Sequence, residues 1–205
     1  KTKAYKSFKN QEGENFHDIY KVEIDKYTIK GTPERLSNKI NTIAGDGPIS
    51  FNTKESTLYY TRSMGEDKDF SSIGIYISKL VNDTFTNPVG FIYNNITYNV
   101  GHPSINETGD LLVFASDMPG GYGKSDLYYC KLVNGKWTLP VSMGDFINTR
   151  FKENFPFLYK NQLYFSSNRE NGVGELDIYR SFLSINGWSA PELLPAPINS
   201  IANDF

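Results

Sequence analysis

Short apolar and aromatic runs recur along the chain, and each is bounded by residues that favour turns. Residues 111–116 (LLVFAS) and 162–167 (QLYFSS) are the clearest examples. Continuous runs of about four to eight such residues are typical of strands that are buried on both faces. Residues 34–40 could form one helical turn, but Gly31 and Pro33 lie beside them and no longer stretch has a helical period. The pattern predicts an all-β chain.

An Asp-hydrophobic-Tyr triplet marks a repeat. Asp18, Asp126 and Asp177 begin three copies, and Gly74 takes the place of the aspartate in the fourth. The tyrosines of the four copies are separated by 56, 52 and 51 residues. A regular period of this size, about 50 residues, is the signature of repeat folds such as propellers. The organisation of the chain therefore follows this repeat.

Other landmarks keep the same order in successive units. They are a proline that opens the unit, a tight turn before a tryptophan, and an Ile-Asn pair that closes the unit, for which Ile96 takes the equivalent place in the second unit. These landmarks are Pro48, Pro103 and Pro156; Asn134-Gly135 before Trp137 and Asn186-Gly187 before Trp188; and Ile40-Asn41, Ile147-Asn148 and Ile198-Asn199.

Each unit is predicted to form four antiparallel strands. The first strand starts at the proline, a turn leads to the second, and a Gly-rich loop such as 118–123 leads to the third at the aspartate. The Asn-Gly pair makes the hairpin to the fourth strand, because both positions tolerate positive φ. Radial repetition of four-stranded antiparallel units gives a β-propeller. The predicted blades are residues 1–46 (in part), 47–101, 102–154 and 155–205.

The blades at the two ends are predicted to be incomplete. Residues 4–7 match the second strand of a blade, so its first strand is not among these residues. At the other end, Asn203-Asp204-Phe205 matches Glu153-Asn154-Phe155, just before the proline of a new blade. We therefore expect about four blades of a ring of five or six. A closed four-bladed ring would need a strand supplied from outside these residues.

The blade pattern resembles a known family. The proline-started strand, the run at 163–167, the Gly-rich loop, Asp177-Ile178-Tyr179 and Trp188-x-x-Pro191 are similar to TolB-type, WD-repeat-like propeller blades. The resemblance extends to the PorE-like, OmpA-family envelope proteins of Bacteroidetes, which belong to type IX secretion and gliding machinery. It implies a periplasmic, outer-membrane-associated protein. The implied partners are other envelope proteins, such as an outer-membrane barrel, and peptidoglycan through a domain outside this chain.

Composition and charge narrow the possible partners. The chain has 14 Tyr and 14 Phe, too many aromatic residues for a disordered chain. Its net charge of −2 argues against broad electrostatic binding to nucleic acid or anionic lipid. No apolar run approaches the ~20 residues of a membrane-spanning helix. Cys130 is the single cysteine, which excludes an internal disulfide and a cysteine-built zinc site.

The repeated aspartates Asp18, Asp126 and Asp177 are the most visible polar residues. They could form a ring of ligands, or each carboxylate could accept backbone N–H bonds in the turn that enters its strand. Recurrence at equivalent places in successive blades favours the structural role. Trp137 and Trp188 could be binding platforms, but a large aromatic residue at one blade position is expected to pack between neighbouring blades. We assign these five residues to the structural repeat.

The other motifs do not define a catalytic, metal or cofactor site. Residues 120–125 (GGYGKS) precede a predicted strand, whereas a phosphate loop needs a following helix. His17 and His102 hold non-equivalent positions, and a metal site needs converging ligands. The acidic groups at 66–69 and 175–177 lack the calcium-loop pattern. Their separation, on which glycosidase chemistry depends, cannot be read from the sequence.

The sequence thus predicts a non-catalytic propeller that mediates protein–protein interaction in a bacterial cell-envelope assembly, with no cofactor. Loops at the faces of the ring would dock the partner. The first candidate for this contact is the charged insertion Glu66, Asp67, Lys68 and Asp69, because it alone breaks the repeat. Two alternatives stay open: a glycan-binding or glycan-hydrolysing propeller, and a propeller that filters access to a separate peptidase domain.

Overall fold

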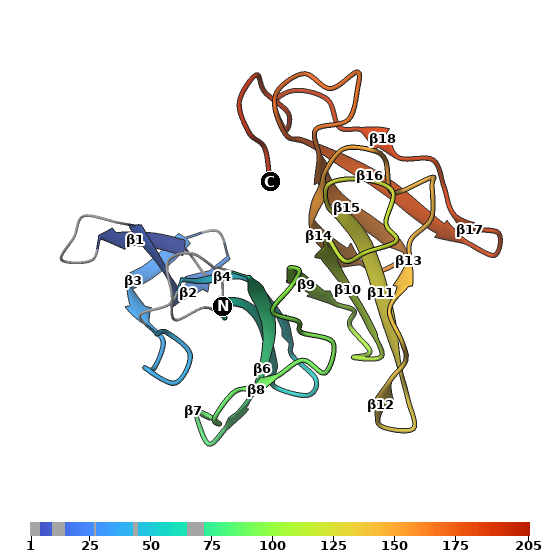
Figure 1. Cartoon of the computed structure of the whole chain (residues 1–205). Coiled ribbons are helices and arrows are strands. Elements are labelled where there is room, and N and C mark those ends of the chain that lie inside the picture. Colours follow the sequence, from blue (N-terminus) through green and yellow to red (C-terminus); the bar gives the residue numbers. More distant parts are fainter. Residues whose placement is uncertain (1–4, 10–14, 27, 43–44, 65–71) are drawn as a thin grey trace.

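The computed structural model describes residues 5–9, 15–26, 28–42, 45–64 and 72–205. All regular elements of these residues are β-strands, and every paired strand runs antiparallel to its neighbours (Figure 1). The strands predicted at 111–116 and 162–167 are present with those bounds. The all-β prediction is therefore confirmed. The strands form four sheets, which we number 1 to 4 in chain order.

Sheets 1 and 2 come from the first half of the chain. Sheet 1 has three strands: β1 (Tyr5–Lys9), β2 (Asn15–Asp25) and β3 (Thr28–Arg35). Sheet 2 has five: β4 (Asp46–Asn52), β5 (Thr57–Ser63), β6 (Ile73–Val81), β7 (Thr84–Phe85) and β8 (Val89–Gly90).

Sheets 3 and 4 repeat the strand order of sheet 2. Sheet 3 has β9 (Val100–Ile105), β10 (Leu111–Ser116), β11 (Asp126–Val133), β12 (Lys136–Trp137) and β13 (Val141–Ser142). Sheet 4 has β14 (Glu153–Tyr159), β15 (Gln162–Ser167), β16 (Asp177–Ser184), β17 (Gly187–Trp188) and β18 (Glu192–Leu193).

The fourth strand position of sheets 2, 3 and 4 is divided between two short strands. In sheet 3, β12 pairs with the end of β11 through Trp137 and Leu132, and β13 pairs with its middle through Val141 and Tyr129. Sheets 2 and 4 show the same division. Each of these sheets therefore has the four predicted strand positions, with the outermost one interrupted.

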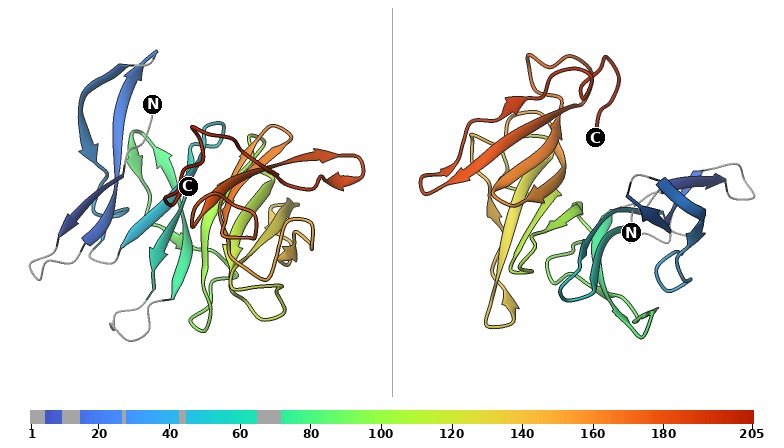
Figure 2. Two further views of the ribbon diagram at one scale, coloured as in Figure 1. Left: turned by 90° about the horizontal axis from the view of Figure 1, so that it is seen from above. Right: turned by 180° about the vertical axis from the view of Figure 1, so that it is seen from behind.

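Hydrophobic clusters fill the spaces between successive sheets. The first strand β9 contacts both β4 and β14, and two further views show the sheets following one another in chain order (Figure 2). Along β10, Leu112 and Phe114 pack toward sheet 2, whereas Val113 and Ala115 pack toward sheet 4. Burial of a large apolar side chain stabilises the fold by about 1.5–3 kcal/mol. The continuous apolar run of β10 thus reflects a strand covered on both faces.

Each first strand begins before the proline that was expected to open it. β4, β9 and β14 start two or three residues ahead of Pro48, Pro103 and Pro156. The pairing register with the second strand shifts at each of these prolines. Proline has no N–H to donate to the ladder, so a bulge accommodates it inside the strand.

An asparagine, buried in sheets 1, 3 and 4 and half-buried in sheet 2, fastens the connection that leaves each sheet to one strand of that sheet, which is β2, β6, β11 or β16. This strand is the third of sheets 2, 3 and 4. In sheet 3, Asn148 Oδ1 accepts the N–H of Leu127 (2.7 Å), and Asn148 Nδ2 donates to the Leu127 carbonyl (3.0 Å). One side chain thus satisfies both backbone groups of a buried residue. The other sheets repeat both bonds with the pairs Asn41 and Ile19, Asn94 and Ile75, and Asn199 and Ile178.

This contact corrects one landmark of the second unit. Ile96 was assigned to the place of the isoleucine that precedes the closing asparagine, and this assignment is wrong. The asparagine that binds the third strand is Asn94, which follows Tyr93, and Ile96 is 79% exposed. The interval from Gly74 to Asn94 is two residues shorter than the corresponding interval in sheets 3 and 4. The spacing of sheets 3 and 4, when applied to sheet 2, therefore places the closing asparagine too far along the chain.

The alignment of Asp204 is also corrected, by one position. The N–H of Asp204 donates to the Leu176 carbonyl (2.7 Å), as the N–H of Glu153 donates to the Ser125 carbonyl (2.8 Å). Asp204 therefore takes the place of Glu153 rather than that of Asn154.

The two hairpins before the tryptophans differ in their turns. In sheet 3 the loop is Asn134-Gly135, with φ of 51° and 74°, as a type I′ turn requires. In sheet 4 the loop is Ile185-Asn186, and Gly187, with a φ of 99°, is already the first residue of β17. The predicted Asn-Gly turn is therefore wrong for sheet 4. Trp137 and Trp188 nonetheless hold equivalent pairing positions.

The contact of the connection asparagine predicts that its substitution destabilises the protein. We expect Asn148→Ala to lower the free energy of unfolding by about 2 kcal/mol, because it leaves the Leu127 N–H buried without a partner. The Leu127 carbonyl loses one of its two donors and keeps the N–H of Met143 (3.0 Å). Urea denaturation followed by tryptophan fluorescence measures this change. Asn186→Ala is the matched control, because Asn186 is exposed in a hairpin loop, and it should cost less than about 0.5 kcal/mol. Equal effects of the two substitutions would contradict this role of the asparagine.

Candidate functional site

The carboxylates of Asp126 and Asp177 cap the loops that enter β11 and β16. Asp126 Oδ2 accepts the N–H groups of Tyr122 (2.7 Å) and Gly123 (3.2 Å). Asp177 accepts two loop N–H groups in the same way. Two backbone donors of the loop at 120–125 are thus engaged by the protein's own carboxylate, and a strand follows the loop. This arrangement does not form a phosphate-binding loop.

Asp18 has a different partner. Its two carboxylate oxygens bind Arg35, with Nε at 2.7 Å and Nη2 at 3.0 Å. The three repeated aspartates belong to three different sheets. In the part of the chain that the structure describes, no group of three His, Cys, Asp or Glu side chains could hold a metal ion. The structure therefore does not bring Asp18, Asp126 and Asp177 together as a ring of ligands.

Glu153 forms a buried ion pair that the sequence analysis missed. Glu153 Oε1 lies 3.3 Å from Nη2 of Arg169 and accepts the hydroxyl of Ser167 (2.8 Å), and Oε2 accepts the N–H of Thr149 (2.9 Å). Burial raises the pKa of Glu153, and these hydrogen bonds oppose that rise. The carboxylate is completely occupied by structural partners.

Sheet 2 holds the same kind of pair. Asp46 Oδ1 lies 2.8 Å from Nε of Arg62, and the guanidinium of Arg62 lies over the rings of Tyr60 and Tyr76 (5.1 and 4.9 Å). The guanidinium of Arg169 likewise lies over two rings of sheet 4. A sequence signal could have revealed these two acids. Each of them follows the closing asparagine of the preceding sheet by five residues.

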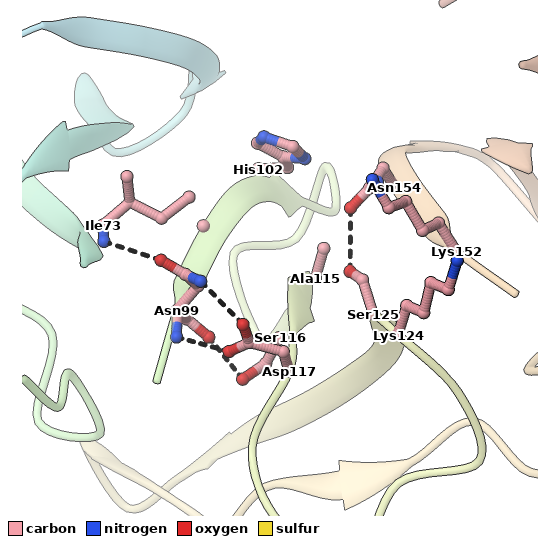
Figure 3. A pocket seen from close by; sticks show the side chains of 11 residues that line it. Ile73, Asn99, His102, Ala115, Ser116, Asp117, Lys124, Ser125, Lys152 and Asn154 are labelled. Carbon is pink, nitrogen blue, oxygen red and sulfur yellow. Dashed lines mark hydrogen bonds between the residues drawn. The ribbon is translucent and has the colours of Figure 1, made fainter. Parts of the chain in front are cut away.

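Sheet 3 lacks such a pair, and a pocket lies at this place. Where sheet 2 pairs Asp46 with Arg62 across its first two strands, sheet 3 pairs Val100 with Ser116. Ser116 lines a pocket of about 220 Å³, with walls from sheets 2, 3 and 4 (Figure 3). Sheet 4 also has a serine, Ser167, opposite its acid, and Arg169 two residues later binds that acid. The corresponding residue of sheet 3 is Met118.

One wall of the pocket carries two lysines. Lys124 precedes β11 and Lys152 precedes β14, and their side chains lie beside each other in Figure 3. Beside them, the hydroxyl of Ser125 donates to Asn154 Oδ1 (2.9 Å). The wall therefore presents cationic groups and a side-chain amide toward the space.

The opposite wall carries the single carboxylate among the described residues that line the pocket. Asp117 Oδ1 accepts the N–H of Asn99 (2.5 Å), and Oδ2 accepts the side-chain amide of Asn99 (2.7 Å). Hydrolysis of a glycoside ordinarily needs two carboxyl groups about 5–10 Å apart. The described lining of this pocket supplies one, and both of its oxygens are engaged.

His102 closes the pocket as an uncharged ring. It stacks on Phe155, with ring centroids 4.1 Å apart and planes 10° apart, and its Nδ1 accepts the Phe155 N–H (3.4 Å). Burial lowers the pKa of His102 to about 4. Phe155 stacks in turn on Phe205. His17 belongs to β2 in sheet 1, so the two histidines come from different sheets.

The remaining residues singled out in the sequence lie away from this pocket. Trp137 packs against the cluster between sheets 2 and 3, and Trp188 against the cluster between sheets 3 and 4. Cys130 is buried in the former cluster, and burial raises its pKa to about 12. The predicted contact segment, Glu66, Asp67, Lys68 and Asp69, lies outside the described residues.

Comparison with known proteins identifies the fold. No protein-family model and no curated protein matches the sequence. The chain is similar to a protein assigned as TolB from Agrobacterium tumefaciens, with a TM-score of 0.54 and 14% identity over 93% of this chain and 60% of that one. It is also similar to a thermostable family-43 glycoside hydrolase, with a TM-score of 0.57 and 10% identity over 97% of this chain and 74% of that one.

These likenesses concern the fold alone, because the identities are low. They confirm that the antiparallel sheets are blades of a β-propeller. The chain spans 60% of the length of the TolB protein that it matches.

Sheet 4 has an ion pair where sheet 3 has two apolar side chains, which predicts how sheet 4 responds when its ion pair is replaced by apolar residues. Arg169→Met alone should destabilise the protein by about 3 kcal/mol, because Glu153 stays buried without its cation. The double variant Glu153→Val/Arg169→Met copies Val100 and Met118 of sheet 3 and should recover at least half of that loss. Urea denaturation measures both. A double variant as unstable as the single one would contradict the exchangeability of the pair.

The environment of His102 predicts a pH dependence of stability. An unfolded histidine has a pKa of about 6.5, and burial lowers that of His102 to about 4. As pH falls through this window the unfolded state binds the proton first, so stability should decrease between about pH 6.5 and 4 and be unaffected by His102 above it. An NMR titration, with the signal assigned through His102→Phe, measures the pKa. A value near 6.5 in the folded protein would contradict the buried, stacked ring.

Proposed function

We propose that this chain is a non-catalytic propeller module that binds other proteins within a bacterial cell-envelope assembly. The main support for the proposal is that the buried Asp and Glu side chains have structural partners. Every buried Asp or Glu of the described residues binds backbone N–H groups, arginine or hydroxyl groups that hold the blades together: Asp18, Asp46, Asp126, Glu153 and Asp177. A catalytic acid would instead be directed into a cavity.

The surface that the proposal assigns to the partner is the end of the blades where the third strands begin. We call it the connection face, because the connections between successive sheets also lie there. It carries the pocket of sheet 3 and two exposed aromatic residues, Tyr122 (51% exposed) and Phe146 (66% exposed). Exposed aromatic groups on loops held by a rigid scaffold are typical of protein-binding surfaces.

The envelope setting is the finer part of the proposal, and its support is the motif resemblance of the blades. It comprises a periplasmic, outer-membrane-associated location, partners such as an outer-membrane barrel or other type IX secretion and gliding components, and peptidoglycan attachment through a domain outside this chain. No helix of the described residues is long and apolar enough to cross a membrane. Glycan binding or hydrolysis is the competing function that the experiment must separate from this one.

Site-specific photo-cross-linking in the source bacterium tests the proposal. A photoreactive residue at Tyr122 or Phe146 should capture one discrete envelope protein. The same residue at Val133 or Ile185, which are exposed at the opposite end of the blades, should capture it much less. Equal capture from both ends, or none from the connection face, would contradict a partner at this face.

A parallel hydrolysis screen with glycoside substrates tests the non-catalytic assignment. We expect no turnover above background, because the described pocket lining offers a single, engaged carboxylate. Turnover that disappears in Asp117→Asn would overturn the assignment in favour of a glycoside hydrolase.

A further inference from the structure

The pocket of sheet 3 has a charge pattern that the equivalent place in sheet 4 does not share. Two backbone bonds tie its lysine-bearing segments together: the N–H of Lys124 donates to the Phe151 carbonyl, and the N–H of Glu153 donates to the Ser125 carbonyl, both at 2.8 Å. Lys124 and Lys152 are therefore held next to each other by the backbone. Their proximity is a property of the fold and not of side-chain rotation alone.

Neither lysine has an acidic partner among the described residues. The nearest carboxylates along the chain are engaged elsewhere, because Asp126 accepts the N–H groups of Tyr122 and Gly123, and Glu153 binds Arg169. Two cationic side chains on adjacent backbone segments add their positive potentials, which favours a bound anion.

The equivalent place in sheet 4 is neutralised internally. There the bridge between Leu176 and Asn203 replaces the one between Ser125 and Lys152. Asn203 Nδ2 donates to Glu175 Oε2 (3.0 Å), so an acid and an amide stand where sheet 3 has two lysines. The cationic pair is thus not a requirement of the blade structure.

Two further residues that line the pocket offer donors. Asn154 Oδ1 is occupied by the hydroxyl of Ser125, and in the described part of the chain Asn154 Nδ2 has no hydrogen-bond partner. His102 lines the pocket and is uncharged at neutral pH. Because its Nδ1 accepts a bond from Phe155, its proton resides on Nε2, which leaves a donor. Lysine, amide and imidazole donors together match a ligand group that only accepts hydrogen bonds, such as a carboxylate.

The size of the pocket restricts the ligand. Pockets for drug-sized ligands have volumes of roughly 300–1,000 Å³, whereas this one has about 220 Å³. It accommodates one acidic side chain more readily than a series of sugar rings. Tyr122, exposed on the loop before Lys124, offers an apolar contact for the rest of a peptide.

We propose that the pocket between Lys124, Lys152 and Asn154 binds a glutamate or aspartate side chain from an acidic segment of the partner protein. The inference rests on the proposed function and names the chemistry by which the connection face recognises its partner. The carboxylate of the partner protein supplies the negative charge that the two lysines lack in this chain.

Isothermal titration calorimetry with defined probes tests the inference. The acetylated and amidated peptide Glu-Glu-Glu should bind the wild-type chain at low ionic strength, and Lys124→Gln/Lys152→Gln should weaken it by about tenfold or more, since two charge-assisted hydrogen bonds are lost. Lys136→Gln removes a lysine from the opposite end of sheet 3 and should leave the affinity unchanged. An equal loss in both variants would show non-specific charge attraction and overturn the inference.

The other ligand classes are separate arms of the same experiment. The peptide Gln-Gln-Gln, trigalacturonate and inorganic phosphate should each bind at least about tenfold more weakly than Glu-Glu-Glu. Tighter binding of trigalacturonate would assign the pocket to an acidic glycan, and equal binding of phosphate would assign it to any small anion. Either result overturns the assignment to a peptide.

A second measurement does not depend on the folding of the variants. In the wild-type chain, Glu-Glu-Glu should shift the amide NMR signals of Lys124, Lys152 and Asn154 but not that of Lys136. Absence of these shifts overturns the inference. If the photo-cross-links from Tyr122 and Phe146 are nevertheless present, the pocket assignment fails and the proposed function stands. If the peptide binds but no partner is cross-linked, the proposed function fails.

Discussion

The contact between a connection asparagine and the third strand determines how each blade joins the next. Asn148 binds both backbone groups of Leu127, and the same two bonds recur in the other three sheets. The bonds are buried in sheets 1 and 3 and partly buried in sheets 2 and 4, so their loss leaves backbone groups with little access to water. They set where the chain leaves one blade and therefore where the first strand of the next blade begins. The wedge between blades is then filled by the hydrophobic clusters.

At equivalent positions between the blades, the protein uses either a buried ion pair or two apolar side chains. Sheets 2 and 4 bury an acid with an arginine that lies over two aromatic rings. Sheet 3 uses Val100 and Met118, and Met118 packs against the cluster between sheets 2 and 3. A buried ion pair and an apolar pair of similar volume often give similar stability. The blade that uses the apolar pair is also the one that lines the pocket, so a local change in packing accompanies the candidate site.

The repeat and the fold could be predicted from the sequence, because the landmarks are local and recur. The errors arose where spacing varies by one or two residues. The connection to Asn94 is shorter than in sheets 3 and 4, the hairpin before Trp188 is displaced by one position, and Asp204 takes the place of Glu153. The pocket could not be predicted, because its lining residues come from three sheets and the bridge between Ser125 and Lys152 brings two of its segments together. Contacts between sheets leave no local sequence signal.

The divided outer strand has a consequence for behaviour at high concentration. Pro88, Pro140 and Pro191 each stand immediately before the second of the two short outer strands, β8, β13 and β18. A proline offers no N–H, and each piece of the outer strand has two residues, so the outer edges of sheets 2, 3 and 4 cannot template a long strand from another molecule. The rim of the propeller therefore resists edge-to-edge aggregation, and a crowded assembly can hold many copies without unspecific β-pairing along it.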